Sequence, residues 1–102
     1  MKFLLEVKIP TEVANKKLKD GSLIKEMHAY LGEIKPEAIY FGIRYGARTL
    51  FMVVNAPAPE KLPEICEPLW LDWSAHVEVL PVMDSHKFEK AGPGIQKVLK
   101  SR

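Results

Sequence analysis

Three side chains with acid–base chemistry are predicted to share one face of a β-sheet. His76 and Glu78 alternate along one strand-like segment, and Glu6 lies on the matching face of another segment near the N-terminus. A histidine beside carboxylates can act as a general acid or base, because an imidazole changes its charge near neutral pH. The same trio also fits a cross-strand ion pair or a polar contact between two protein copies. His76 is therefore a candidate catalytic residue, and the structural explanation stays open beside it.

The other reactive side chains point less clearly to a site. Cys66 is predicted on the buried side of a helix, where a thiol behaves as a small hydrophobic group. His28 and His86 fall on different elements and have no second ligand at a recognised metal-binding spacing. Arg44 and Arg48 bracket a predicted turn and could hold a carboxylate or phosphate, although exposed arginines at a hairpin tip are common. We expect no metal site, and nothing suggests a bound cofactor.

The elements that position these residues follow from the spacing of apolar side chains. Two segments that alternate apolar and polar residues predict strands, Lys2–Ile9 and Ser74–Val82. Helical spacing over 13–34 is split at Asp20-Gly21, and a later helix from about Pro59 is expected to kink or end at Pro68. Asp84 can cap a final helix, which the sequence Gly92-Pro93-Gly94 should break.

This order of elements predicts an α+β fold. The segments alternate as strand, helix, strand, strand, helix, strand, followed by a C-terminal helix. Short connections and right-handed crossovers make this a ferredoxin-like βαββαβ arrangement, with an antiparallel sheet of spatial order 4-1-3-2 and the helices on one face. A chain of 102 residues is expected to form a single domain over residues 1–102.

The hairpin between residues 38 and 56 decides which side chains share a sheet face. A two-residue turn at Tyr45-Gly46 would fix the pairing, whereas a three- or five-residue loop would reverse it. With the two-residue turn, the face predicted to lie under the helices carries Ile39, Phe41, Ile43, Arg48, Leu50, Met52 and Val54. The opposite face carries Leu4, Glu6, Lys8, Tyr40, Arg44, Thr49, Phe51, His76, Glu78 and Leu80.

That opposite face mixes aromatic and aliphatic groups with a few charges. Leaving it exposed is costly, because each Å² of apolar surface removed from water stabilises by roughly 25 cal/mol. A twofold homodimer, sheet against sheet, would cover it. The alternative is a monomer whose terminal helix folds over the face. The apolar residues available for that are Phe88, Ile95, Val98 and Leu99.

Composition and charge argue against several classes of partner. Residues 85–102 hold five basic side chains and one acidic one, a net charge of +4, so the first 84 residues sum to −2 within the total of +2. A solvated helix face explains the basic segment, and "RTLFMVVN" lacks the glycines and aromatic spacing of an RNA-recognition strand. We expect no nucleic-acid partner and no membrane insertion. The single cysteine suits a reducing compartment, which predicts a cytoplasmic location.

Seven segments carry a family resemblance: "FLLEVKIP", "DGSL", "KPEAIYF", "RTLFMVVN", "LPEICEPLW", "VEVLPVM" and "KAGPGI". With them the chain resembles the dimeric α+β barrel superfamily, in which two ferredoxin-like sheets pair into a barrel. That superfamily includes small monooxygenases and muconolactone isomerase-like proteins. More narrowly, the chain is similar to an uncharacterised bacterial family of about this length. The resemblance implies the fold and a homodimer, but it carries no catalytic signature.

Two hypotheses about function follow. In the first, the dimer binds a small organic molecule in a pocket between sheet and helices or inside the barrel, with Tyr40 and Phe51 in its apolar wall. Glu6, Thr49 and Glu78 would then supply polar contacts and His76 the catalytic group, in a cofactor-independent isomerase or monooxygenase-like reaction. In the alternative, the protein is a non-enzymatic regulatory or interaction protein whose barrel interior is packed with side chains.

Overall fold

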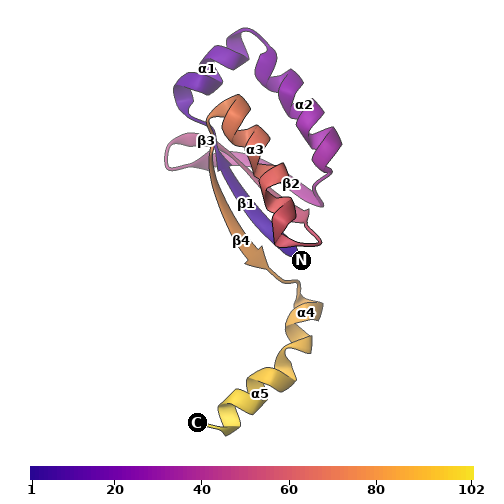
Figure 1. Cartoon of the computed structure of the whole chain (residues 1–102). Coiled ribbons are helices and arrows are strands. Elements are labelled where there is room, and N and C mark those ends of the chain that lie inside the picture. Colours follow the sequence, from indigo (N-terminus) through magenta and orange to yellow (C-terminus); the bar gives the residue numbers. More distant parts are fainter.

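The computed structural model describes residues 1–102 and contains one four-stranded antiparallel sheet (Figure 1). Its strands are β1 (Lys2–Lys8), β2 (Ala38–Arg44), β3 (Ala47–Asn55) and β4 (His76–Val82), in the spatial order β2-β3-β1-β4. The helices are α1 (Thr11–Lys19), α2 (Ser22–Ile34), α3 (Leu62–Trp73), α4 (Ser85–Lys90) and α5 (Gly92–Lys100), with a 3-10 turn at Pro59–Lys61. The predicted ferredoxin-like α+β fold is confirmed.

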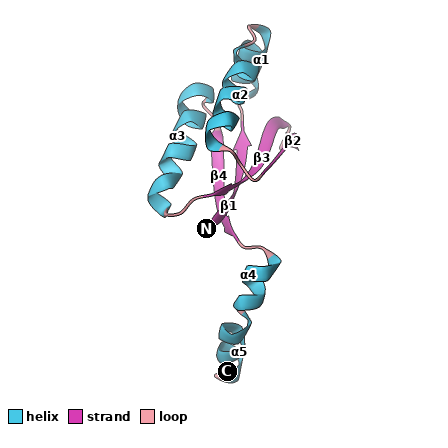
Figure 2. Ribbon diagram, turned by 90° about the vertical axis from the view of Figure 1, so that its right-hand side faces the viewer, coloured by secondary structure: helices cyan, strands magenta, loops and turns pink.

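The hydrophobic core lies between the sheet and the helices α1 to α3, which cover one face of it (Figure 2). β1 is central, paired with β3 on one side and β4 on the other. Its alternate side chains point into the core, where Leu5 and Val7 are completely buried. The opposite face of the sheet carries no helix of the same chain, and we call it the open face.

The hairpin has the predicted two-residue turn. Tyr45 has a φ of 52° and Gly46 a φ of 72°, which is the left-handed geometry that a tight hairpin turn with right-handed strand twist requires. Arg44 pairs with Ala47, and the register continues without a bulge to the other end of β2. This register confirms the predicted division of the hairpin between the two sheet faces.

The prediction that helices cover one face of β2 is wrong for the half of the strand nearest the turn. Phe41 and Ile43 lie on the side that faces the helices, yet they are 62% and 82% exposed. The hairpin reaches past the helical layer, so no helix of the same chain lies over its tip (Figure 1). On β3, by contrast, Leu50 and Met52 are buried as expected.

α3 passes through Pro68 and continues to Trp73, so of the two predicted effects of this proline, a kink or an end of the helix, the end is wrong. A proline inside a helix removes one backbone hydrogen bond. Here the buried side chains lie on both sides of Pro68, with Ile65 before it and Leu69 and Trp73 after it. Tertiary packing supplies most of the stability of a protein helix, so the burial of these side chains compensates for the missing hydrogen bond and the helix continues.

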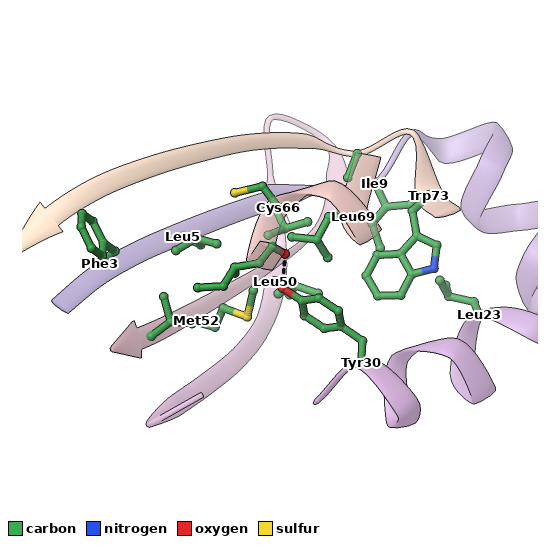
Figure 3. Packing of buried hydrophobic residues seen from close by; sticks show 14 of the residues in the cluster. Phe3, Leu5, Ile9, Leu23, Tyr30, Leu50, Met52, Cys66, Leu69 and Trp73 are labelled. Atoms are coloured by element: carbon green, nitrogen blue, oxygen red, sulfur yellow. Dashed lines mark hydrogen bonds between the residues drawn. The ribbon is translucent and has the colours of Figure 1, made fainter. Parts of the chain in front are cut away.

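A buried hydrogen bond ties α2 to α3 (Figure 3). The Tyr30 hydroxyl donates to the backbone carbonyl of Ile65 at 2.7 Å, and the Tyr30 ring lies 6.1 Å from that of Trp73. Burial raises the pKa of the Tyr30 phenol well above its usual range. The hydroxyl therefore keeps its proton, and the hydrogen bond is made throughout the neutral range.

The last two helices leave the body of the protein altogether. Asp84 caps α4 as predicted, because its carboxylate accepts a hydrogen bond from the Lys87 amide at 2.9 Å. The helix breaks as expected at this point: α4 ends at Lys90, and Gly92-Pro93-Gly94 forms the first turn of α5, where proline is well tolerated. We call residues 85–102 the C-terminal arm. It projects from the end of β4 and does not fold over the open face of its own sheet (Figures 1 and 2).

The arm makes the chain long for its size. The principal extents are 59 × 28 × 19 Å and the radius of gyration is 17.0 Å. A compact domain of this length has a radius of gyration of about 13 Å. No helix in the structure is long and apolar enough to cross a membrane.

We predict that Tyr30→Phe lowers the free energy of unfolding by about 1–2 kcal/mol, because the buried Ile65 carbonyl loses its donor. Urea denaturation followed by circular dichroism measures the change. The matched control is Tyr40→Phe, whose ring lies 71% exposed on the open face, and which should leave the stability unchanged. Equal stability of the two variants would show that the hydrogen bond contributes nothing.

The same tyrosine predicts a pH dependence. A phenol whose pKa is raised by folding stabilises the native state fully below its ordinary pKa of 10.0 and loses that contribution as the pH rises beyond it. The wild-type protein should therefore lose more stability between neutral and strongly alkaline pH than Tyr30→Phe does. Parallel urea titrations across that pH range test this, and identical pH profiles for the two proteins would contradict it.

Candidate functional site

Charged and polar side chains gather near one end of the open face. We call this set the polar cluster; it consists of Glu6, Lys8, Arg44, Tyr45, Thr49, His76 and Glu78. Strand pairing places Glu6 beside Glu78, and Lys8 between Thr49 and His76. The side chains surround a hollow of about 110 Å³. The structure thus brings together four of the six site residues expected from sequence: Glu6, Thr49, His76 and Glu78.

Both carboxylates of the polar cluster have a basic partner within it. Glu6 and Glu78 are cross-strand neighbours, an arrangement that repels when both are ionised. Each carboxylate has its own partner: Arg44 Nε lies 3.2 Å from Glu6, and His76 Nε2 lies 2.8 Å from Glu78 Oε1. Because His76 and Glu78 are mostly exposed in the single chain, their pair stabilises the fold by less than about 1 kcal/mol.

Tyr40 and Phe51 are the other two site residues expected from the sequence. They form a row with Glu6 across the strands of the open face. Tyr40 pairs with Phe51, which pairs in turn with Glu6. Tyr40 is exposed, and Thr49 next to this row is buried, its hydroxyl donating to the Ala47 carbonyl at 3.1 Å. All six residues therefore share the open face, and their role in binding stays a prediction.

A much larger hollow lies on the other side of the sheet, between the α1–α2 corner and the β2–β3 hairpin. We call it the helix-side groove; its volume is about 680 Å³. Apolar side chains form most of its wall, among them Ile9, Leu23, Met27, Leu31, Phe41 and Leu50. This size and composition are those of a site for a small organic molecule.

Two basic side chains, His28 and Arg48, belong to that wall. His28 lies in the middle of α2, directly after Met27. Arg48 lies on β3, and its guanidinium donates to Asn15 Oδ1 at 3.0 Å, which ties the hairpin to α1. Arg48 therefore retains further donor groups, since a guanidinium has five N–H bonds.

Sequence reasoning did not select His28 or Arg48 as residues of a shared site. For Arg48 a signal existed, because strand parity already placed it among the apolar residues of the helix-facing side. A charged residue on such a face needs a polar partner or a functional role. For His28 no such signal existed, because its position in the groove depends on how far α2 stands from β2.

Cys66 lies buried on the core side of α3, as expected. Burial, and to a lesser degree the nearby Glu67 carboxylate, raise the pKa of its thiol above the ordinary value. The reactive thiolate is thus scarce at neutral pH, which argues against a nucleophilic role. No group of three or more histidine, cysteine or acidic side chains is arranged to hold a metal ion.

Comparison with known proteins identifies a fold relative. No protein-family model matches the sequence, and no curated protein of similar sequence is found. Among solved structures, the chain is similar to 5-chloro-2-hydroxyhydroquinone dehydrochlorinase (TftG) from Burkholderia phenoliruptrix AC1100, in complex with 2,5-dihydroxybenzoquinone. The TM-score is 0.60 at 15% identity, and the match covers 84% of this chain and 98% of that one.

The likeness is one of fold. It agrees with the ferredoxin-like α+β arrangement of strands and helices described above. An identity of 15% carries no activity from one chain to the other.

We predict that Cys66 reacts with a disulfide reagent such as Ellman's reagent roughly tenfold or more slowly than free cysteine at pH 8, because burial both blocks access and suppresses the thiolate. The release of thionitrobenzoate measures the rate. Full and rapid reaction in denaturing urea is the control for a reduced thiol. A fast reaction of the folded protein would restore Cys66 as a candidate nucleophile.

Proposed function

We propose that this protein binds a small, largely apolar organic molecule in the helix-side groove. The observation that carries the proposal is the groove itself, about 680 Å³ with a mainly apolar wall that includes two basic side chains, His28 and Arg48. Sites for small organic molecules combine those features, because apolar burial supplies affinity and a few polar groups set orientation.

The two basic side chains narrow the class of ligand. The Arg48 guanidinium can hold a carboxylate or a phenolate-like oxygen through charge-assisted hydrogen bonds. The His28 imidazole is a side chain of the kind that can act as a general acid or base. A ring or short chain bearing an acidic oxygen fits this pair. The 2,5-dihydroxybenzoquinone recorded with TftG is a molecule of that kind, which supports the choice of ligand class.

If the protein is an enzyme, proton transfer on such a ligand is the reaction that the groove favours. His28 would move the proton and Arg48 would stabilise negative charge on the oxygen, with no cofactor required. This keeps the cofactor-independent isomerase or monooxygenase-like reaction of the first hypothesis from the sequence. It moves the proposed catalytic histidine from His76 on the open face to His28 in the groove.

The polar cluster suits a protein interface better than a ligand site. Its hollow of about 110 Å³ is small for an organic ligand, and Glu6 and Glu78 already have ionic partners. We infer that the open faces of two copies pack together in a homodimer. This pairing would bury Leu4, Tyr40, Phe51 and Leu80, and with them the Arg44–Glu6 ion pair.

A second candidate function is a non-enzymatic regulatory or interaction protein. The paired charges and the small hollow of the polar cluster favour this second function, because a barrel interior packed with side chains would leave no space for a ligand there.

We further infer a cytoplasmic protein of one domain, and membership of the narrower bacterial family whose seven segments it resembles.

The hairpin offers a matched pair of variants for testing the site. Arg48 lines the groove, and Arg44 lies on the opposite face in the polar cluster. We predict that Arg48→Ala weakens the binding of 2,5-dihydroxybenzoquinone by roughly tenfold or more, the value of a charge-assisted hydrogen bond of about 1.5–3 kcal/mol. Arg44→Ala, measured at a concentration at which it keeps the subunit number of the wild type, should change the affinity by less than about twofold, because Arg44 does not line the groove. Isothermal titration calorimetry measures both.

Native mass spectrometry of freshly purified protein comes before the titration. A co-purified small molecule would name a better probe, and the subunit number would test the homodimer. Thermal melts of both variants control for loss of the Arg48–Asn15 hydrogen bond. Weaker binding in Arg44→Ala alone would move the site to the polar cluster. Failure of the wild-type protein to bind any acidic aromatic probe would favour the non-enzymatic alternative.

A further inference from the structure

The sheet has two edge strands, β2 and β4, and only one of them is protected against pairing with another strand (Figure 2). An edge strand presents unpaired backbone N–H and C=O groups, which a further strand can use. β4 carries the ionisable pair His76 and Glu78, and it contains Pro81, which has no N–H to offer. β2 contains no proline, and its only charged residue is Arg44 at the last position. The free edge of β2 is therefore open to another strand.

The hydrogen bonds of β3 show which backbone groups of β2 point to that free edge. The Ile9 amide donates to the Arg48 carbonyl at 3.1 Å, and the Ala56 amide donates to the Met1 carbonyl at 2.9 Å. The even-numbered residues of β3 thus bond to β1, and the odd-numbered ones face β2, because the direction alternates along a strand.

The partners of those odd-numbered residues are Ala38, Tyr40 and Gly42, which consequently bond to β3. Ile39, Phe41 and Ile43 lie between them, so their N–H and C=O groups point outward from the sheet.

The side chains of β2 are uncovered as well. Tyr40 lies on the open face, Phe41 and Ile43 lie on the helix side, and all three are mostly exposed. Gly42 is exposed between them. β2 makes its extensive contacts with β3 alone. An apolar edge with free hydrogen-bonding groups is a site of association when it is left in water.

A second copy of β2 fits this edge, because the strand is complementary to itself around Phe41. Phe41 is the middle residue of Ala38–Arg44, so antiparallel pairing about it uses all seven positions. On the helix side, Phe41 then meets Phe41 of the second copy, and Ile39 meets Ile43. On the open face, Tyr40 meets Gly42, which has no side chain to oppose the ring. Apolar residues therefore meet apolar residues or glycine in the centre of the contact.

The basic residues of the hairpin do not oppose this pairing. Arg44 meets Ala38 of the second copy, and its guanidinium keeps its own partner, Glu6. Antiparallel pairing sends the two hairpin tips in opposite directions, so the two Arg44 residues lie six positions, or about 20 Å, apart. Arg48 lies one strand further from the edge, and the two copies of it are also about 20 Å apart. Salt largely screens charges beyond about 8–10 Å.

We propose that two copies of this chain pair antiparallel through the free edges of β2, in register about Phe41, and form one continuous eight-stranded sheet. Three outward N–H groups in each copy then make six hydrogen bonds across the twofold axis. This contact extends the sheet sideways and leaves both open faces uncovered. It is therefore separate from the packing of open faces inferred above, and the two contacts together would build a tetramer with three perpendicular twofold axes. No ligand is required for it.

Variants of Ile43 test the contact in the full-length chain. Ile43→Lys places a charge opposite Ile39 of the second copy and should weaken the pairing at least roughly tenfold. Ile43→Pro should do the same, because it removes an outward N–H and no hydrogen bond to β3. Leu71→Lys makes the same change of charge on α3, at a residue that is 77% exposed, and should change the association by less than about twofold. Sedimentation velocity over a dilution series measures dissociation, and circular dichroism checks the fold.

The subunit number separates this contact from the packing of open faces. If both contacts form, the wild-type protein is a tetramer and Ile43→Lys a dimer. If the edge contact forms alone, the wild-type protein is a dimer and Ile43→Lys a monomer. A subunit number that neither Ile43 variant lowers would overturn the edge pairing, whatever the open faces do.

A cross-link tests the register. The two Phe41 residues would form a hydrogen-bonded pair with their Cα atoms about 5.5 Å apart, so Phe41→Cys should oxidise to a disulfide-linked dimer. The two Ile43 residues would lie four positions, or about 14 Å, apart, so Ile43→Cys should give little. Cys66 is buried in both variants. Random collisions would favour Ile43→Cys, the more exposed position, and equal or greater linking there would overturn the register.

Amide hydrogen exchange followed by NMR identifies the groups that pair. The amides of Ile39, Phe41 and Ile43 should exchange slowly in concentrated protein and rapidly after dilution. Those of Tyr40 and Gly42 bond to β3 and should stay protected longer at both concentrations. Rapid exchange of the three outward amides in concentrated protein would overturn the proposal. Slow exchange without a Phe41→Cys cross-link would assign the edge to a different strand and overturn self-pairing.

Discussion

The tight turn at Tyr45-Gly46 is the constraint on which the arrangement of both hollows depends. A left-handed backbone at two consecutive residues allows β2 and β3 to pair in one register only. That register sends Arg48 to the helix side and Arg44 to the open face. With one residue more in the turn, Arg44 would pair with Arg48, and both arginines would lie on the same face of the sheet. The chemistry of each face is thus set by a backbone conformation at the tip of the hairpin.

Much of the fold follows from the sequence because alternation and helical spacing are local patterns. β1 alternates apolar and polar residues, and this predicts a half-buried strand whose buried side includes Leu5 and Val7. The exposure of Phe41 and Ile43 could not be predicted in this way, because it depends on how far the helical layer extends across the sheet. The passage of α3 through Pro68 depends likewise on core contacts made after the chain has folded.

The candidate site was predictable only in part, because local patterns decide which residues share a face but not how far apart the packed elements stand. Strand parity was sufficient to group Glu6, Thr49, His76 and Glu78 on one face, since residues on paired strands must be neighbours. The helix-side groove is a gap between α2 and β2, and no pattern along the chain records the width of a gap. The two hollows differ in kind: one is small with paired charges, and the other is large and apolar. A single hairpin can therefore serve a partner on one face and a ligand on the other.

The detached arm has a consequence for how the molecule reaches its native form. The sheet and its helices complete their core without the arm, so this part can fold by a process that is first order in chain concentration. An arm that packs only against another copy adds a second-order step, whose rate rises with the concentration of folded chains. A newly synthesised chain would carry the exposed apolar residues of the arm, Phe88, Ile95, Val98 and Leu99, in contact with water until a partner covered them. The time spent in that state, with its risk of aggregation, would be shortest when several chains are synthesised close together.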